Sequence, residues 1–205
     1  MFYETSAGHG LPHDPFKAIV APRPIGWIST VDASGVPNLA PYSFFNAVSS
    51  TPPMLAFSSE GLKDSVINAR DTREFVYNLV TLELLDPMNK TSAQLPHGQS
   101  EFDFAGLESA PSHMVKPPRV ARAAAALECK VVQVVSLRDL NNTDTGRYMV
   151  IGQVVGTYID ENYLINGLFQ TALAQPVARC GYRDYVSVST VFQLSRPDDA
   201  PSHPK

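Results

Sequence analysis

The stretch V-P-N-L-A-P-Y-S-F-F-N-A-V-S-S-T-P-P-M-L-A-F-S-S-E-G-L-K, residues 36–63, combines four prolines with small, hydroxyl-bearing and aromatic residues. Each proline fixes one backbone angle and removes an N–H donor, so we expect the chain between Pro41 and Pro52 to be extended and rigid. Its aromatic faces, hydroxyls and amide would suit a planar ligand rich in heteroatoms. Alternatively, the segment is a buried loop whose hydroxyls satisfy its own backbone, and the segment alone does not decide between the two.

The composition indicates a globular protein with one domain. The chain has 205 residues, of which 44% are hydrophobic and 18% charged, and its net charge is −4 without a basic run. These values allow a sizeable core and argue against nucleic acid as the main partner. No apolar stretch reaches the roughly 20 residues of a membrane helix, and the N-terminus lacks the pattern of a signal peptide. Cys129 and Cys180 make no disulfide framework, so we expect reduced thiols in a cytoplasmic protein.

Short alternating segments between turns predict a mainly β fold. The expected strands cover residues 25–31, 36–40, 54–58, 74–80, 127–137, 147–159 and 185–194. Gly152 and Gly156 are expected to mark bulges or bends within the strand over residues 147–159. Many short strands with few helices predict a closed β-barrel with helical additions.

Two short helices are expected beside this barrel. One begins after Asp64 or Ser65, each a good N-cap residue, and the other covers residues 86–94 with Asp86 as its cap and Pro87 at its first position. The stretch 95–112 is polar and irregular, and a loop of that length is either functional or mobile.

The start of the first helix is a candidate anion site. Ser58, Ser59, Lys63, Asp64 and Ser65 surround it. Free N–H groups and the helix dipole favour a phosphate there, and Lys63 adds a positive charge. A plain capped helix with a solvated lysine would explain the same residues. The segment between Pro41 and Pro52, a few residues earlier, offers a surface the size of a ring, and this favours the phosphate site over the plain capped helix.

The stretch R-C-G-Y-R-D-Y, residues 179–185, is a second candidate. Its two arginines and two tyrosines could clamp a phosphate or stack on a ring. It could equally be a surface loop in which Arg183 and Asp184 partly neutralise each other.

Other kinds of site find less support. The five histidines are scattered, and none pairs at ligand spacing with another or with a cysteine, so no metal site is expected. Neither a G-x-S-x-G elbow nor a G-x-G-x-x-G or Walker loop is present. His97, in L-P-H-G, could be a catalytic acid or an ordinary loop residue.

Four stretches in order along the chain resemble the flavin reductase-like, FMN-binding split-barrel family. They are R-P-I-G-W-I-S-T-V-D-A-S-G-V-P-N-L-A-P-Y-S-F-F-N-A-V-S-S-T-P-P at 23–53, L-K-D-S-V-I-N-A-R-D-T-R-E-F-V-Y-N-L-V at 62–80, S-E-F-D-F-A-G-L at 100–107 and A-R-C-G-Y-R-D-Y at 178–185. The resemblance covers roughly residues 15–192, and the ordered set is more specific than any one motif. It implies a split β-barrel with FMN near the interface of a homodimer.

The same resemblance implies the residues of the flavin site. Those implied at the flavin ring and in its neighbouring wall are Ser29, Thr30, Asn38, Ala40, Pro41, Tyr42, Ser43, Phe44, Phe45 and Asn46. Those implied at the phosphate are Ser58, Lys63, Asp64 and Ser65, where the family often carries Thr in place of Ser65. Arg183 and Tyr185 would reach the flavin of the partner subunit, and His97 and Glu101 would be catalytic residues on the nicotinamide side.

The implied activity is that of an NAD(P)H-dependent flavin reductase. NADH or NADPH would deliver hydride to FMN, with FAD as a further candidate substrate, and a monooxygenase component could receive the reduced flavin or its electrons. The expected organisation is an arm over residues 1–16, the split-barrel domain over 17–194 and a flexible tail over 195–205. The alternatives are an FMN-binding electron carrier without NAD(P)H activity, a flavin-free binding protein, and a barrel of the pyridoxamine-phosphate-oxidase type.

Overall fold

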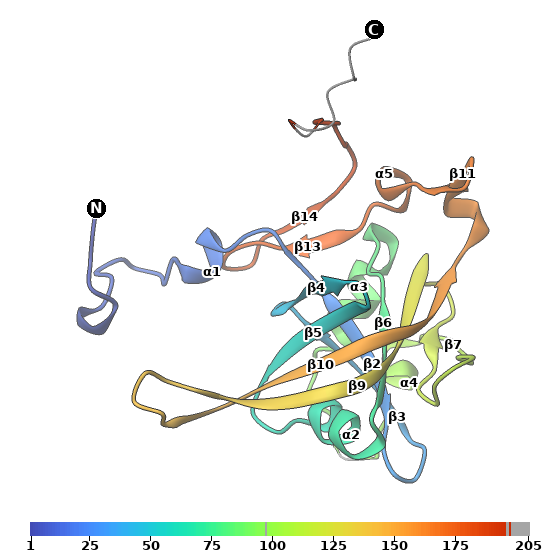
Figure 1. Ribbon diagram of the computed structural model, residues 1–205, viewed down its shortest axis with the longest axis horizontal. Helices are drawn as coiled ribbons and strands as arrows, with labels where there is room; N and C mark the ends of the chain where they lie inside the picture. Colours follow the sequence, from blue (N-terminus) through green and yellow to red (C-terminus); the bar gives the residue numbers. More distant parts are fainter. Residues whose placement is uncertain (97, 196, 198–205) are drawn as a thin grey trace, which may run out of the picture.

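Seven antiparallel strands form the main sheet, in the order β3-β2-β6-β9-β10-β5-β4 (Figure 1). The structure, a computed structural model, describes residues 1–96, 98–195 and 197. The strands of this sheet are β2 (Gly26–Val31), β3 (Pro37–Tyr42), β4 (Phe45–Ser50), β5 (Pro53–Glu60), β6 (Glu74–Asn78), β9 (Ala125–Arg138) and β10 (Asp144–Ile159). The predicted mainly β class is confirmed. The prediction of full closure is wrong, because within the described residues no strand pairing joins the two edge strands, β3 and β4.

Smaller elements surround this sheet. A three-stranded sheet contains β1 (Arg23–Pro24), β13 (Val177–Arg179) and β14 (Tyr185–Ser187), and two strand pairs consist of β7 (Ser109–Ala110) with β8 (Arg119–Val120) and β11 (Leu164–Ile165) with β12 (Leu168–Phe169). The helices are α1 (Phe16–Ile19), α2 (Asp64–Thr72), α3 (Leu85–Lys90), α4 (Glu101–Ala105) and α5 (Thr171–Ala174), with 3-10 turns η1 (Thr5–Ala7), η2 (Leu82–Leu84) and η3 (Glu161–Tyr163). None of the helices in the described ranges has the length and apolar character needed to cross a membrane.

Strand β2 is buried on both faces and separates two hydrophobic clusters. Trp27 packs with Leu39, Met88 and Phe102 on the side of α3 and α4. Ile28, the next residue, faces the opposite side and packs in the cluster that contains Phe57, Val66 and Phe75. Because neighbouring strand residues point to opposite faces, one apolar strand can serve both clusters.

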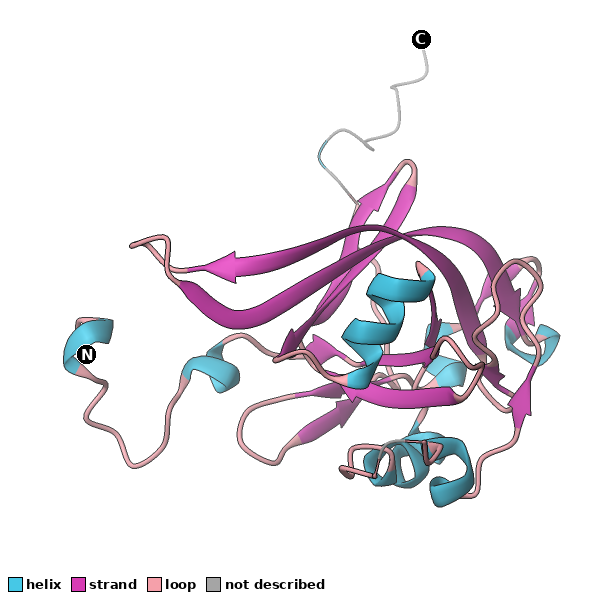
Figure 2. Cartoon of the chain, turned by 90° about the horizontal axis from the view of Figure 1, so that it is seen from below, coloured by secondary structure: helices cyan, strands magenta, loops and turns pink. Residues whose placement is uncertain are grey.

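The hairpin of β9 and β10 is the longest element and arches over helix α2 (Figures 1 and 2). The strand register shifts between Ile151 and Gly152 and again between Val154 and Gly156, which confirms the two predicted irregularities. A Cβ added at Gly152 would lie 2.3 Å from the ring of Phe75. Glycine is therefore required there so that β10 can approach the core.

Two acidic side chains attach the segment between β7 and β8 to the sheet. Glu128 on β9 accepts hydrogen bonds from the backbone N–H groups of His113, at 2.9 Å, and Met114. Glu74 on β6 accepts one from the N–H of Lys116, at 2.8 Å, and forms an ion pair with Lys130. These bonds satisfy backbone donors that a segment lying on a sheet would otherwise leave unpaired.

The predicted N-cap of α2 is wrong by one or two residues, and both predicted ends of α3 are also wrong. Helix α2 begins at Asp64, and its N-cap residue is Lys63, whose backbone is extended and whose carbonyl accepts from the N–H groups of Val66 and Ile67. Helix α3 begins at Leu85 after the turn η2, so that Pro87 is its third residue rather than its first. It ends at Lys90 instead of residue 94, because Thr91 turns back onto α3 and receives a hydrogen bond from Trp27.

Two further predictions about segments were wrong. The expected loop over residues 95–112 contains helix α4, which Ser100 caps by accepting from the N–H of Phe102 and which ends at Gly106 in the left-handed region. Strand β14 ends at Ser187 instead of residue 194, because β13 offers it only three partner residues. Beyond that point Phe192 is 90% exposed. Most of the expected tail over 195–205 lies outside the described residues.

Replacing Glu74 with glutamine is expected to flatten the acid dependence of stability. Burial alone would raise the pKa of Glu74, but its bonds to Lys130 and to the N–H of Lys116 outweigh this and hold the pKa below its ordinary value of 4.5. The carboxylate therefore stabilises the fold fully above pH 4.5, and this contribution is lost as the pH falls through the lower folded pKa.

Urea unfolding measured between pH 7 and pH 3 checks this expectation. The Glu74→Gln variant should be less stable than the parent by about 1 kcal/mol at pH 7 and should approach it in acid. The exposed Glu83→Gln variant is the control, and equal slopes for Glu74→Gln and the parent would contradict the assignment.

Candidate functional site

The site that best matches the sequence expectations is a cavity of about 460 Å³ between β3, the start of α2 and the segment after α3. We refer to it as the β3–α2 cavity. Its lining residues are Asn38, Ala40, Pro41, Tyr42, Lys63, Asp64, Ser65, Thr91, Ser92, Ala93, Gln94, Leu95 and Glu101. The fold thus brings the proline-bounded segment and the helix start, two stretches singled out separately in the sequence, to one cavity.

Asn38 is the centre of a hydrogen-bond network beside this cavity. Its side-chain oxygen accepts from the hydroxyls of Thr30, at 3.3 Å, and Ser65, at 2.7 Å. Its amide nitrogen donates to both carboxylate oxygens of Glu101, at 3.1 and 3.0 Å. The network therefore joins β2, β3, α2 and α4 through one side chain, and it uses the Ser65 hydroxyl as a donor within the protein.

Glu101 acts in this structure as a positioning residue. Its carboxylate also accepts from the backbone N–H of Leu39 at 2.9 Å, so the hydrogen bonds from Asn38 and Leu39 fix it against β3. Burial raises the pKa of Glu101, while the bonds from Leu39 and Asn38 act in the opposite direction. A carboxylate held by this many donors keeps the edge strand in place.

Tyr42 lies at the inner side of the same cavity. Burial raises the pKa of its phenol, and the hydroxyls of Ser65 and Ser59 counter that effect. Tyr42 therefore stays protonated and is a neutral hydrogen-bonding group near the start of α2.

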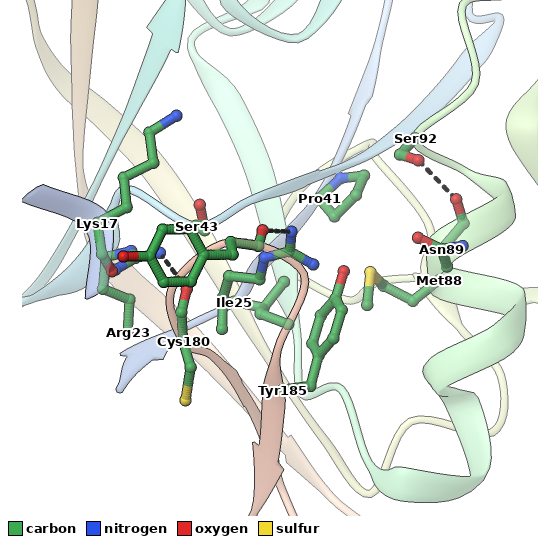
Figure 3. Close-up of a pocket in the computed structure, with 12 residues that line it drawn as sticks. Lys17, Arg23, Ile25, Pro41, Ser43, Met88, Asn89, Ser92, Cys180 and Tyr185 are labelled. Carbon is green, nitrogen blue, oxygen red and sulfur yellow. Dashed lines mark hydrogen bonds between the residues drawn. The ribbon is translucent and has the colours of Figure 1, made fainter. Parts of the chain in front are cut away.

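A second cavity, of about 360 Å³, lies beside the first and is referred to as the β13 cavity (Figure 3). Its lining residues are Lys17, Arg23, Ile25, Pro41, Ser43, Met88, Asn89, Ser92, Arg179, Cys180, Tyr182 and Tyr185. Pro41 and Ser92 line both cavities, which makes the two neighbours. Of the expected flavin residues, Pro41, Ser43 and Tyr185 lie here.

A third cavity, of about 650 Å³, lies on the outer side of β4 and is referred to as the β4 cavity. It is lined by Ser43, Phe44, Phe45, Asn46 and Ser58 from the expected set, and by apolar residues that include Ile19, Val20 and Val48. Ser58 therefore lies apart from Lys63, Asp64 and Ser65, with which the sequence grouped it. The reason is strand alternation, because Ser58 and the buried Ser59 face opposite sides of β5.

The remaining predicted residues are more scattered. Ser29 and Thr30 are fully buried and line none of these cavities; Ser29 donates to the carbonyl of Pro118 and Thr30 accepts from Asn68. Arg183 is exposed and lines a separate hollow with Asp86, Arg179 and Tyr185. His97 lies outside the described residues.

Several lining residues were not anticipated. Residues 91–95 reach the β3–α2 cavity because α3 ends early, and no sequence signal distinguishes them from an ordinary helix end. Lys17 lies on α1, just after the expected arm over residues 1–16, and Arg23 lies within the first of the four stretches that resemble the family. Arg23 and Arg179 pair across two short strands, and this pairing marks both as candidate site residues. It could not be predicted from the sequence, because the two residues are far apart in the chain.

The chain belongs to the flavin reductase-like family, because the family model described as "Flavin reductase like domain" matches residues 20–173. An uncharacterized protein from Aquifex aeolicus is 39% identical over 173 residues, which are 82% of this chain and 85% of the relative.

Two solved structures share the fold. Component B of nitrilotriacetate monooxygenase from Bacillus cereus superposes with a TM-score of 0.85 at 27% identity, over 95% of this chain and 98% of that one. The 2-nitrobenzoate 2-nitroreductase of Pseudomonas fluorescens also gives a TM-score of 0.85, at 26% identity over 100% of both chains. The family resemblance and the split-barrel fold predicted from the sequence are thus confirmed.

Replacing Glu101 with alanine is expected to destabilise the protein by about 2–3 kcal/mol, because the N–H of Leu39 and the amide of Asn38 would lose their buried acceptor. Urea unfolding measures the loss, and Glu83→Ala, on an exposed ion pair with Arg122, is the control. An unchanged midpoint for Glu101→Ala would contradict the positioning role.

Proposed function

We propose that the protein is an FMN-binding oxidoreductase, an NAD(P)H-dependent flavin reductase that transfers hydride to flavin and passes the electrons to an acceptor. The observation that carries this proposal is the β3–α2 cavity, where the start of α2 with Lys63 and the wall of Ala40, Pro41 and Tyr42 meet. A ligand with a phosphate at one end and a flat ring at the other would contact both the start of α2 and this wall.

The start of α2 fits a phosphate. Lys63 is exposed at the N-cap, and the first N–H groups of a helix have no partner within the helix. Because the Ser65 hydroxyl already donates to Asn38, its backbone N–H and that of Asp64 would hold the phosphate with Lys63. The Asp64 carboxylate lies in the first turn, where it favours the helix but opposes an anion.

The wall of β3 fits the flavin ring. Ala40, Pro41 and Tyr42 line the β3–α2 cavity, and Pro41 and Ser43 continue the same wall into the β13 cavity. Proline lacks an N–H, so part of this wall is an apolar face on which a ring can lie. Phe44, Phe45, Asn46 and Ser58 line the β4 cavity, and in this proposal they serve the flavin at the interface with a second copy.

When bound, FMN supplies a ring that accepts hydride from NADH or NADPH and gives up electrons to an acceptor. The protein's own residues bind and orient the reactants, and Glu101 lines the β3–α2 cavity with its carboxylate held by Asn38 and Leu39. Two neighbours suggest the acceptor: the Bacillus protein is a component of a monooxygenase, and the Pseudomonas protein is a nitroreductase. A monooxygenase component is therefore the partner we propose.

The proposal extends to assembly and location. A homodimer is supported by the exposed apolar side chains of Ile19, Phe44 and Val48 around the β4 cavity, which a second copy could cover. A cytoplasmic location is supported by two free cysteines, Cys129 and Cys180. We retain an arm over 1–16, a domain over 17–194 and a tail over 195–205 as the proposed organisation. The reach of Arg183 and Tyr185 to the partner's flavin is likewise part of the proposal.

Replacing Lys63 with alanine is expected to weaken FMN affinity about 10- to 100-fold, because a charge-assisted bond to the phosphate is lost. The exposed side chain has no hydrogen bond or ion pair among the described residues, so the variant should fold normally. Fluorescence titration measures affinity, with Arg70→Ala on the same helix as the control. Equal affinities for Lys63→Ala and the parent would refute the phosphate assignment.

Anaerobic mixing of the FMN-loaded protein with NADH or NADPH tests the activity. The visible flavin absorbance should bleach within seconds, and the faster donor identifies the coenzyme preference. Bound flavin that bleaches no faster than free FMN would identify an electron carrier instead, and a protein that FMN cannot colour would refute flavin binding altogether.

A further inference from the structure

Three cationic side chains share the β13 cavity, and no carboxylate from the described residues lines it. They are Lys17, Arg23 and Arg179, which come from α1, β1 and β13. The ion pairs found in the described part of the chain all involve other residues. In a protein of net charge −4 this concentration of positive charge is unusual and points to an anionic ligand.

Arg23 and Arg179 are direct partners across neighbouring antiparallel strands, β1 and β13. Like charges directly opposite each other on one face of a sheet destabilise the pairing. Tyr185 on β14 is the next member of the same row, and the Arg179 guanidinium carbon lies 4.3 Å from the centre of its ring. An anion between the two guanidinium groups would relieve their repulsion.

Arg23 is only 7% exposed, and its guanidinium group has an unused donor. Its terminal nitrogens donate to the carbonyls of Lys17, Val20 and Cys180, the last at 2.9 Å. Its Nε is buried without a hydrogen-bond partner. A buried charge with an unpaired donor is costly unless a ligand pairs it, and Figure 3 shows Arg23 at the edge of the cavity beside Cys180.

Helix α1, which carries Lys17, is held beside the same cavity by close packing. A Cβ added at Gly181 would lie 2.7 Å from the Cα of Ala18, so only glycine allows the turn after β13 to contact α1 this closely. The hydrogen bonds from Arg23 to the carbonyls of Lys17 and Val20 fix the helix from the other side.

We propose that the β13 cavity binds the anionic group, a carboxylate or a phosphate, of a planar organic substrate. Ile25, Pro41 and Met88 supply apolar surface, and Tyr185 supplies a ring for stacking. Because Pro41 and Ser92 also line the β3–α2 cavity, such a substrate lies beside the flavin ring. That this substrate takes part in a redox reaction rests on the proposed function, whereas the binding of its anionic group does not.

Calorimetric titration tests the subsite with two probes, benzoate for the carboxylate and NADP⁺ for the phosphate. Binding of both probes is measured on the parent with and without FMN. A failure to bind FMN would refute the proposed function, but the anion subsite would still be tested by the titrations without FMN. The variants are Arg179→Gln, Arg179→Lys and Lys17→Gln, and Arg70→Gln on α2 is the charge-matched control. Arg23 is left unchanged because its three carbonyl bonds support the fold.

Arg179→Gln should weaken binding of at least one probe about tenfold, and Lys17→Gln a few-fold, with part of the affinity retained by Arg179→Lys. Loss with benzoate alone identifies an organic acid as the substrate, and loss with NADP⁺ alone identifies the nucleotide phosphate. If neither probe binds the parent, or if Arg179→Gln and Arg70→Gln bind both equally well, the proposal is overturned.

Discussion

The side chain of Asn38 holds together the elements that form the β3–α2 cavity. Its oxygen accepts from Thr30 on β2 and Ser65 on α2, and its nitrogen donates to Glu101 on α4. An amide is suited to this position because it offers two donors and an acceptor at once, whereas a carboxylate would be repelled by Glu101. β3 is an edge strand, so these side-chain bonds replace part of the support that a second neighbouring strand would give.

Different residues of the proline-bounded segment line different cavities. Pro41 and Tyr42 face the β3–α2 cavity, Ser43 lies at both the β13 and the β4 cavities, and Phe44 is exposed in the β4 cavity. The split between β3 and β4 leaves backbone and side chains of one continuous segment accessible from several directions. A closed barrel would have covered them with a further strand pairing, and this opening is what supports the proposal of a ring site near a subunit interface.

The β3–α2 cavity and the β13 cavity also differ in the charges of their lining residues. The β3–α2 cavity combines Lys63 with Asp64 and Glu101, so its positive character depends on the start of α2 and on one lysine. The β13 cavity contains two opposed arginines and a lysine, and the described residues place no acid in its lining. The first arrangement suits a ligand held largely by backbone N–H groups, and the second suits an anionic group that side chains clamp.

Local patterns in the sequence were enough to predict the family, the mainly β class, the positions of most strands, the bulges at Gly152 and Gly156, and the presence of a helix next to Lys63. It did not predict helix α4, the early end of α3, or the separation of Ser58 from Lys63. The first two depend on turns that packing selects, and the third on which face of β5 is buried. That Glu101 is bound to β3 and that Arg23 pairs with Arg179 can be learned only from the folded chain. Leu39 and Glu101 are 62 positions apart, and Arg23 and Arg179 are 156 positions apart. Contacts over such distances produce no local sequence pattern, because they form only when distant strands and helices pack together.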